Sequence, residues 1–261
     1  MKKYGILAHP ANHSLSPIMH NASFKALEID ASYEIFDVAE DNLDAFLEDA
    51  RKNLAGFSVS LPYKEILMNK VDVLDEACLK IGALNTVVNR NGKLFGYNTD
   101  YIGALKALGD VSDKKIALLG AGGSAKAIFY GLSKAGANVF VFNRDKSKAT
   151  LLAGGNGFGL EKISGPFDVL IQSTSIWTIN PSAVLEDLIS EEVLEQVDTV
   201  MDIIYKPLIT PLLKKASEMG KKIVTGEKML LYQAMEQFKI WTGMEAPYEV
   251  MKQALEKGLS L

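Results

Sequence analysis

In KKIALLGAGGSAKAIFYGLSKAGANVFVFNRD, residues 114–145, an apolar strand leads through a glycine-rich turn into a helix, and the helix leads into a second apolar strand. Two strands joined by a crossover helix form a βαβ unit, in which the strands lie parallel in one sheet. Further apolar strands are expected at residues 168–175, 197–205 and 221–226. The segment therefore predicts an α/β domain whose mostly parallel sheet is covered by helices on both faces.

The turn within this segment matches a dinucleotide-binding fingerprint, Gly120-x-Gly122-x-x-Ala125, between a strand and a helix. Gly120 permits the tight turn, and Gly122 lets backbone N–H groups approach a pyrophosphate. The N-terminus of the following helix adds a partial positive charge that suits an anion. The alternative is a turn that only packs tightly. The complete strand, helix and second strand favour the dinucleotide site.

The end of the second strand indicates which dinucleotide is bound. An NAD site has an acidic residue roughly 20 residues after the turn, where it grips the ribose 2′-hydroxyl. Here Asn143 and Arg144 occupy this position, and Lys146 and Lys148 follow. Cations suit the additional 2′-phosphate of NADP. Asp145 would repel that phosphate, so we expect NADP and leave NAD open.

The first hundred residues show the same alternation of strands and helices. Strands are expected at residues 3–9, 31–38 and 56–61, helices at 16–29 and 41–53, and a hairpin at 84–100 that turns at Asn91-Gly92. Ser16 is expected to cap the first helix, with Pro17 in its first turn. Two more helices are expected at 226–244 and 248–259. The chain is therefore expected to form two α/β domains.

Composition excludes several classes of function. A net charge of −4 disfavours nucleic acid and acidic membranes as partners. The single cysteine, Cys78, excludes an intrachain disulfide and suits a reducing compartment. His9, His13 and His20 are separated by prolines that interrupt any shared helix, so we expect no metal site. A small-molecule substrate remains the expected partner.

The apolar runs are too short to cross a bilayer, and the start of the chain lacks a secretory signal. We therefore expect a cytoplasmic protein with no membrane partner.

Polar residues gather at the expected ends of elements in the first domain. Ser14 and Ser16 lie in alternate positions before a helix, and Lys64 follows the strand of GFSVSLPYK, residues 56–64. Asn85 and Asp100 lie at strand ends around the hairpin. Taken singly, the serines could only cap a helix, the lysine could be a solvated charge, and the last two could be turn residues.

Together these motifs resemble the shikimate dehydrogenase family over nearly the whole chain. They occur in that family's order and spacing as HSLSPIMHN, GFSVSLPYK, IGALNTVVN, GYNTDYIG, GAGGSAKA, NRD, DIIYKPLITPLL and MLLYQAMEQFKIWTG. The resemblance implies a catalytic substrate-binding domain at 1–102, a Rossmann-like NADP-binding domain at 103–226, and C-terminal helices at 227–261 that pack on the first domain. It implies a monomer or homodimer.

The resemblance also implies an activity and a set of site residues. The activity is the reversible reduction of 3-dehydroshikimate to shikimate with NADP. Lys64 and Asp100 match the catalytic pair. Substrate contacts are implied for Ser14 and Ser16 on the carboxylate, for Ser60, Asn85 and Gln233 on the ring hydroxyls, and for Asp100 and Tyr205. Cofactor contacts are implied for Gly120, Ala121, Gly122, Gly123, Ser124, Ala125, Asn143, Arg144, Lys148, Thr174, Ile203 and Gly226.

Chemistry supports the catalytic pair independently of the resemblance. Hydride addition to a ketone creates an alkoxide that must receive a proton, and a lysine can donate that proton. The same ammonium stabilises the developing negative charge. A neighbouring aspartate would orient it.

Three departures from the family pattern leave alternatives open. Ser58 stands where the family usually has asparagine, Gln172 and Trp177 alter a turn expected beside the cofactor, and Asp145 replaces a customary threonine. One alternative is a quinate/shikimate dehydrogenase that uses NAD or both cofactors. Another, of a different class, is a non-catalytic dinucleotide-binding module.

Overall fold

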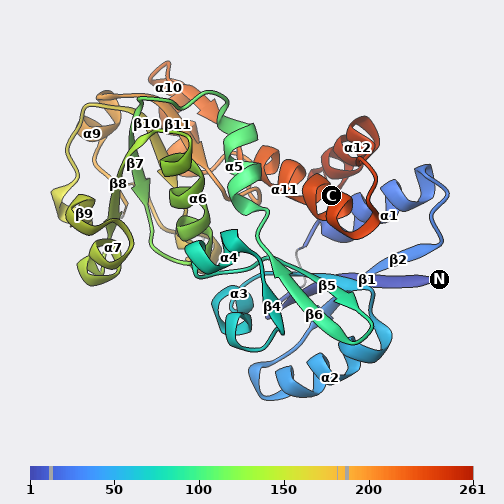
Figure 1. The fold of residues 1–261 in the computed structure, drawn as a ribbon. Coiled ribbons are helices and arrows are strands. Elements are labelled where there is room, and N and C mark those ends of the chain that lie inside the picture. The colour runs from blue at the N-terminus through green and yellow to red at the C-terminus, as the bar shows by residue number, and fades with distance from the viewer. Residues whose placement is uncertain (12–13, 181, 186–187, 261) are drawn as a thin grey trace. The chain divides into compact units, whose positions relative to one another are not determined.

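The computed structural model describes the whole chain except residues 12–13, 181, 186–187 and 261. The chain divides into two compact units (Figure 1). Unit 1 comprises Met1–Asp100 and Leu231–Leu261, and unit 2 comprises Tyr101–Leu230. Each unit is built on its own six-stranded sheet with helices, which confirms the predicted α/β class. Within the described part of the chain, no helix has the length and apolar character needed to span a membrane.

The sheet of unit 1 has the strand order β2-β1-β3-β5-β6-β4. Its strands are β1 Lys2–Ala8, β2 Ala31–Asp37, β3 Gly56–Val59, β4 Val73–Leu74, β5 Thr86–Arg90 and β6 Lys93–Tyr97. The β1–β2, β1–β3 and β4–β6 pairs are parallel, whereas β3–β5 and β5–β6 are antiparallel. The β5–β6 hairpin turns at Asn91 and Gly92, both with positive φ, as the Asn-Gly pair predicts.

The helices of unit 1 cover both faces of this sheet. They are α1 Ser16–Ala26, α2 Leu43–Asn53, α3 Tyr63–Ile66, α4 Glu76–Ile81 and α12 Tyr248–Leu259, with the 3₁₀ turns η1 Glu40–Asn42 and η2 Leu67–Asn69 and the second half of α11 Gly226–Thr242. Apolar side chains of α2 pack with Phe57 and Val87 on one face. On the other face α1 and α11 bring Phe24 and Trp241 against Tyr4 of β1.

The start of α1 differs from the sequence prediction. Leu15, not Ser16, is the N-cap, and Ser16 is already the first helical residue. The Ser14 hydroxyl accepts a hydrogen bond from the Ser16 backbone N–H at 3.3 Å. The prediction was wrong by one residue: the helix begins at Ser16 itself, and its N-cap, Leu15, makes no side-chain capping bond.

The sheet of unit 2 has the order β12-β11-β10-β7-β8-β9, and all its pairs are parallel. Its strands are β7 Lys115–Leu119, β8 Asn138–Asn143, β9 Gly157–Gly159, β10 Phe167–Gln172, β11 Val197–Asp202 and β12 Lys222–Val224. The chain runs outward from β7 to β9 and then restarts beside β7 at β10. The ends of β7 and β10 therefore form the switch point at which α/β sheets bind their ligands.

The helices of unit 2 enclose an apolar core on each face of this sheet. They are α5 Asp100–Leu108, which begins on the last residue of unit 1, α6 Gly123–Lys134, α7 Lys146–Ala153, α8 Ile176–Ile179, α9 Glu191–Glu195, α10 Pro211–Glu218 and the first turn of α11, with the 3₁₀ turns η3 Gly154–Asn156 and η4 Leu160–Lys162.

A buried histidine in unit 1 makes the stability of that unit depend on pH. The His20 ring stacks on Tyr33 with centroids 4.5 Å apart, and burial lowers the pKa of His20 to about 3. The unfolded chain protonates His20 near pH 6.5, but the folded chain does not. Its contribution to stability is therefore complete above pH 6.5 and is lost as the pH falls toward 3.

We expect His20→Phe to remove this dependence. Between pH 7.5 and pH 5, His20 protonation costs the parent roughly 2 kcal/mol of unfolding free energy that the variant does not lose. Urea denaturation at several pH values measures the unfolding free energy of each protein. His20→Leu, which has another shape and no titrating group, should show the same pH dependence as His20→Phe. If the unfolding free energies of the parent and both variants changed with pH in the same way, His20 would not be the source of the pH dependence.

Candidate active site

A buried ion pair in unit 1 joins residues at the starts of two helices. Lys64 is the second residue of α3, directly after β3, and Asp100 is the first residue of α5, shortly after β6. Lys64 Nζ donates to Asp100 Oδ2 at 2.6 Å, and the two side chains are only 12% and 6% exposed. A charge-assisted hydrogen bond this far from water is short and strongly directional. The structure thus brings together the two residues that sequence singled out as a pair.

Asn85 holds the second oxygen of Asp100. Its Nδ2 donates to Asp100 Oδ1 at 2.7 Å and lies 2.9 Å from Thr99 Oγ1 and 3.2 Å from Gln233 Oε1. With Lys64 on one carboxylate oxygen and Asn85 on the other, Asp100 is fixed in one orientation. Gln233 comes from α11, 148 positions along the chain from Asn85.

Two threonines and a glutamine that sequence reasoning missed fix Asn85 in turn. Its Oδ1 accepts from the Thr99 backbone N–H and from Thr86 Oγ1, each at 2.8 Å. Its backbone carbonyl accepts from Gln237 Nε2 at 3.1 Å. The signal for the threonines was available, because each follows an asparagine in LNT and YNT. Gln237 lies one helical turn after Gln233, on the same face of α11.

The predicted substrate serines lie at the ends of elements of the same unit. Ser16 is buried at the start of α1, and Ser60 is held just after β3 by its backbone bond to the Leu7 carbonyl at 2.9 Å. The Tyr33 hydroxyl, which sequence reasoning also missed, contacts Ser58 Oγ and the Ser16 side chain. Burial raises the pKa of Tyr33, so this phenol stays neutral.

The glycine-rich turn of unit 2 has the shape that a pyrophosphate needs. Gly120 has φ +115°, and a Cβ there would come within 2.6 Å of Ser173 Oγ. A Cβ on Gly122, by contrast, would meet no atom within 4 Å, so this side of the turn is open. Gly122 is also the N-cap of α6, whose first residue is Gly123. An open backbone at the start of a twelve-residue helix fits a dinucleotide phosphate.

The residues after β8 separate into a free cation and a capping acid. Arg144 is exposed, and within the described part of the chain no acid pairs with its guanidinium. The Asp145 carboxylate caps α7 by accepting from the Ser147 backbone N–H at 3.0 Å, and the hydrogen bonds from Ser147 lower the pKa of Asp145. Its presence therefore has a structural cause apart from any cofactor. Asn143 supports this turn by donating to the Asp145 carbonyl at 3.0 Å.

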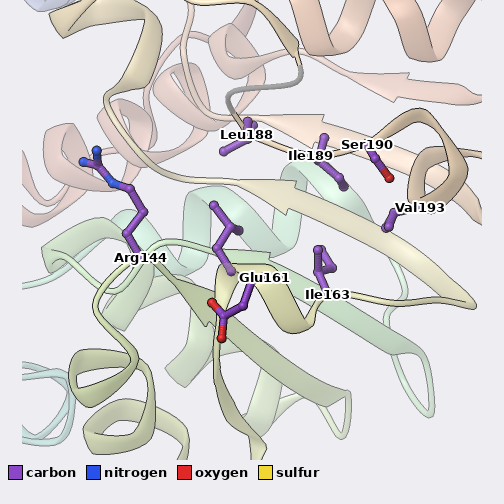
Figure 2. Close-up of a pocket in the computed structure, with 8 residues that line it drawn as sticks. Arg144, Glu161, Ile163, Leu188, Ile189, Ser190 and Val193 are labelled. Atoms are coloured by element: carbon purple, nitrogen blue, oxygen red, sulfur yellow. The ribbon is translucent and has the colours of Figure 1, made fainter.

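A cavity of about 500 Å³ adjoins Arg144. Its walls are formed by Arg144, Leu160, Glu161, Ile163, Leu188, Ile189, Ser190 and Val193. Figure 2 shows the Arg144 and Glu161 side chains extending in different directions, with Leu188 above them and Ile163 on the side of Glu161 away from Arg144. The apolar side chains of this hollow lie together with Arg144, Glu161 and Ser190, and the Arg144 cation suits the phosphate of a ligand.

The ends of β10 and β11 are joined by a buried polar network. Gln172 Nε2 donates to the Thr174 carbonyl at 2.9 Å and lies 3.4 Å from Asp202 Oδ1. Desolvation raises the pKa of Asp202 to about 7, and this residue was not singled out from sequence. Beside it, a Cβ on Gly226 would lie 2.4 Å from the Ile203 carbonyl oxygen, so only glycine fits.

Two other positions named from sequence have structural explanations. Trp177 lies in the apolar core of unit 2, where its Nε1 donates to the Ala183 carbonyl at 3.0 Å, so its bulk serves packing. Cys78 is buried in unit 1, and burial raises the pKa of its thiol. His13 lies outside the described residues, so the expected absence of a histidine metal site stays a prediction.

Three family models and several curated relatives match this chain. Residues 6–87 match the shikimate dehydrogenase substrate binding domain, residues 103–203 the shikimate / quinate 5-dehydrogenase model, and residues 226–256 the shikimate 5′-dehydrogenase C-terminal domain. A shikimate dehydrogenase (NADP(+)) of Pyrococcus abyssi is 42% identical over 262 residues, which cover 97% of this chain and 96% of that protein.

Solved structures of shikimate dehydrogenases also match this chain. A shikimate dehydrogenase in complex with NADP+ has a TM-score of 0.92 at 39% identity, covering 99% of this chain and 96% of that one. A shikimate 5-dehydrogenase from Thermus thermophilus, in complex with NADP(H) and shikimate, has a TM-score of 0.90 at 35% identity, covering 99% of this chain and 100% of that one. This chain belongs to the shikimate dehydrogenase family.

Proposed function

We propose that this protein catalyses the reversible, NADP-dependent reduction of 3-dehydroshikimate to shikimate. The observation that carries the proposal is the Lys64–Asp100 ion pair at 2.6 Å, with side chains 12% and 6% exposed. Burying two charges is costly, and a fold alone is served as well by apolar residues. Such a pair favours an enzyme over a non-catalytic nucleotide-binding module. A cytoplasmic location and a monomer or homodimer belong to the same proposal.

Lys64 handles the proton of the reaction. When bound, NADPH supplies the hydride that adds to the carbonyl carbon of the ring ketone. The Lys64 ammonium stabilises the negative charge that develops on the carbonyl oxygen and then donates a proton to that oxygen. In the direction of shikimate oxidation, the neutral amine of Lys64 accepts the hydroxyl proton.

Asp100 and Asn85 keep Lys64 in the geometry that this step requires. Asp100 Oδ2 accepts from Lys64 Nζ at 2.6 Å, while Asn85 Nδ2 holds the other oxygen at 2.7 Å. Because neither oxygen is free to turn away, the ammonium keeps one position before the substrate arrives. Such preorganisation lowers the cost of reaching the transition state.

The remaining contacts divide between substrate and cofactor. On the substrate we assign the carboxylate to Ser14 and Ser16, the ring hydroxyls to Ser60, Asn85 and Gln233, and further contacts to Asp100 and Tyr205. On the cofactor we assign the pyrophosphate to the turn at 120–125, the 2′-phosphate side to Asn143, Arg144 and Lys148, and the remaining contacts to Thr174, Ile203 and Gly226. The division of the chain into the segments 1–102, 103–226 and 227–261 is part of this proposal.

Initial rates with two substrates and two cofactors test the proposed function. We expect kcat/KM for shikimate with NADP to exceed the value for shikimate with NAD by about 10-fold or more, because Arg144 favours the 2′-phosphate. The proposed reaction also expects a higher kcat/KM for shikimate than for quinate with NADP. Quinate with NAD is the fourth combination of substrate and cofactor to be measured. A preference for quinate with NAD would contradict the proposal, and no turnover with any pair would favour the non-catalytic module.

A further inference from the structure

Three buried hydroxyls meet in unit 1, and only one of them belongs to a residue assigned to the substrate. Ser16, Tyr33 and Ser58 are 4%, 2% and 4% exposed, and they lie on α1, β2 and β3. The Tyr33 hydroxyl bonds with Ser58 Oγ, and the Ser16 side chain lies close enough to lower the pKa of the phenol. These three groups are called the hydroxyl triad below. Tyr33 lies at its centre because it contacts both serines.

The hydroxyl triad contains at least one more hydroxyl proton than the hydrogen bonds within the triad use. Each of the three hydroxyls has one proton to donate, because the Tyr33 phenol is neutral. The Tyr33–Ser58 hydrogen bond uses one of these protons, and the interaction of Tyr33 with the Ser16 side chain uses at most one more. Within the described part of the chain, no further acceptor receives a proton from any of the three hydroxyls. A buried donor without an acceptor is costly, so the third proton suits an acceptor that arrives with a ligand.

The surroundings of Ser16 indicate a negatively charged acceptor. Ser16 is the first residue of α1, an eleven-residue helix whose first turn carries no acidic side chain. The N-terminus of such a helix has a partial positive charge. A surplus hydroxyl proton and a positive helix end at one residue both suit an anion that is bound by neutral donors.

Tyr33 is the member of the hydroxyl triad with a fixed orientation. Its ring stacks on the His20 ring, with centroids 4.5 Å and planes 15° apart, and its centroid lies 5.9 Å from that of the Trp241 ring. Serine hydroxyls rotate freely, whereas this packing holds the phenol oxygen in place. Whichever serine receives the Tyr33 proton, the fixed phenol oxygen limits the directions in which the two serine hydroxyls can point.

We propose that Tyr33 is a positioning residue that orients the Ser16 and Ser58 hydroxyls, so that one serine proton is donated to the carboxylate of the substrate. This inference rests on the proposed function, in which Ser16 binds that carboxylate. Ser58, the position that departs from the family pattern, then acts as a partner of Tyr33. The consequence is a site whose affinity for the acid depends on a phenol that need not touch the substrate.

Tyr33→Phe tests the inference, because it removes one hydroxyl and keeps the packed ring. We expect KM for shikimate to rise about 10-fold, with kcat and KM for NADP changed less than about 2-fold, since the lost bond acts on substrate binding alone. Tyr4→Phe is the matched control. Tyr4 pairs directly with Tyr33 across β1 and β2, is also 2% exposed and also packs on Trp241.

The substrate offers an independent readout that a merely structural role would not move. The methyl ester of shikimate lacks the charge that the serine proton would meet. We expect the effect of Tyr33→Phe on KM to fall from about 10-fold with the acid to less than about 2-fold with the ester. Ser58→Ala should also raise KM more for the acid than for the ester, but by a smaller factor than Tyr33→Phe.

The outcomes separate this inference from the proposed function. If the parent turns over shikimate with NADP but Tyr33→Phe has an unchanged KM, or is affected equally with acid and ester, the positioning role is wrong and the activity stands. If Tyr4→Phe matches Tyr33→Phe, loss of any buried hydroxyl explains the result, and the role is again wrong. If the parent does not turn over shikimate, calorimetric titration of shikimate decides. Equal affinity in the parent and Tyr33→Phe then overturns the inference.

Discussion

Lys64→Met is expected to lower kcat for shikimate oxidation by about 10³-fold, within the range that a positioned general acid or base contributes. Methionine keeps an unbranched side chain of similar length but has no proton to exchange. KM for NADP should stay within about 2-fold, because Lys64 lies in unit 1 and the glycine-rich turn in unit 2. Steady-state rates with varied shikimate and varied NADP measure both parameters.

Loss of stability must be separated from loss of chemistry in this variant. Lys64→Met leaves Asp100 buried without its charged partner, which should lower the unfolding free energy by about 3–5 kcal/mol. Adding Asp100→Asn removes that buried charge, so the double variant should recover stability but not kcat. Lys70→Met is the control, because Lys70 lies nearby in sequence but pairs with the exposed Asp44. A kcat for Lys64→Met within about 2-fold of the parent would show that another group handles the proton.

Local patterns predict the fold well because each element carries its own signal. Gly120 adopts φ +115° beside Ser173, and Asn91-Gly92 forms the turn of a hairpin. These residue types therefore predict the local structure. The prediction of a Ser16 cap was wrong because a serine at a helix start fits the N-cap and the first helical position alike, and the N-cap here is Leu15. Such errors shift a boundary by one residue but leave the topology unchanged.

The hydrogen bonds of the site could not be derived from local patterns. Asn85 and Gln233 meet across 148 positions of the chain, and Tyr33 and Ser58 across 25. Alternation in ASYEIFD predicts a strand, yet it does not reveal which buried side chain faces a serine of another element. The resemblance to a known family supplied Asn85 and Gln233. It did not supply Tyr33, which emerged only from the packed structure.

The pKa of Asp202 shows the same limit. Its position at the end of β11 follows from the apolar strand, but its rise to about 7 depends on burial that three dimensions create. The hydrogen bonds from Ile204 N–H and Thr210 Oγ1, at 2.9 and 2.8 Å, partly offset that burial. The sequence shows only that an aspartate lies at the end of the strand, whereas its burial and hydrogen bonds are seen only in the structure.

Arg144→Ala is expected to raise KM for NADP by about 10²-fold and to change KM for NAD by less than about 2-fold. The exposed guanidinium follows β8, where a Rossmann-like fold presents the ribose of its cofactor. A planar guanidinium can donate two parallel hydrogen bonds to a phosphate, and NAD has no phosphate at the 2′ position. Initial rates with each cofactor, at saturating shikimate, measure the two constants. Lys134→Ala changes net charge equally at the far end of α6 and should leave both unchanged.

The choice between two roles of Asp145 depends on the same measurement. If its carboxylate repelled the 2′-phosphate, Asp145→Asn would lower KM for NADP, because the charge is lost while an oxygen remains to cap α7. The bond from Ser147 N–H to Asp145 at 3.0 Å commits this side chain to the cap, so we expect KM for NADP to change less than about 2-fold. Equal losses for NADP and NAD in Arg144→Ala would mean that Arg144 does not distinguish them. The cofactor preference would then lie outside the turn that follows β8.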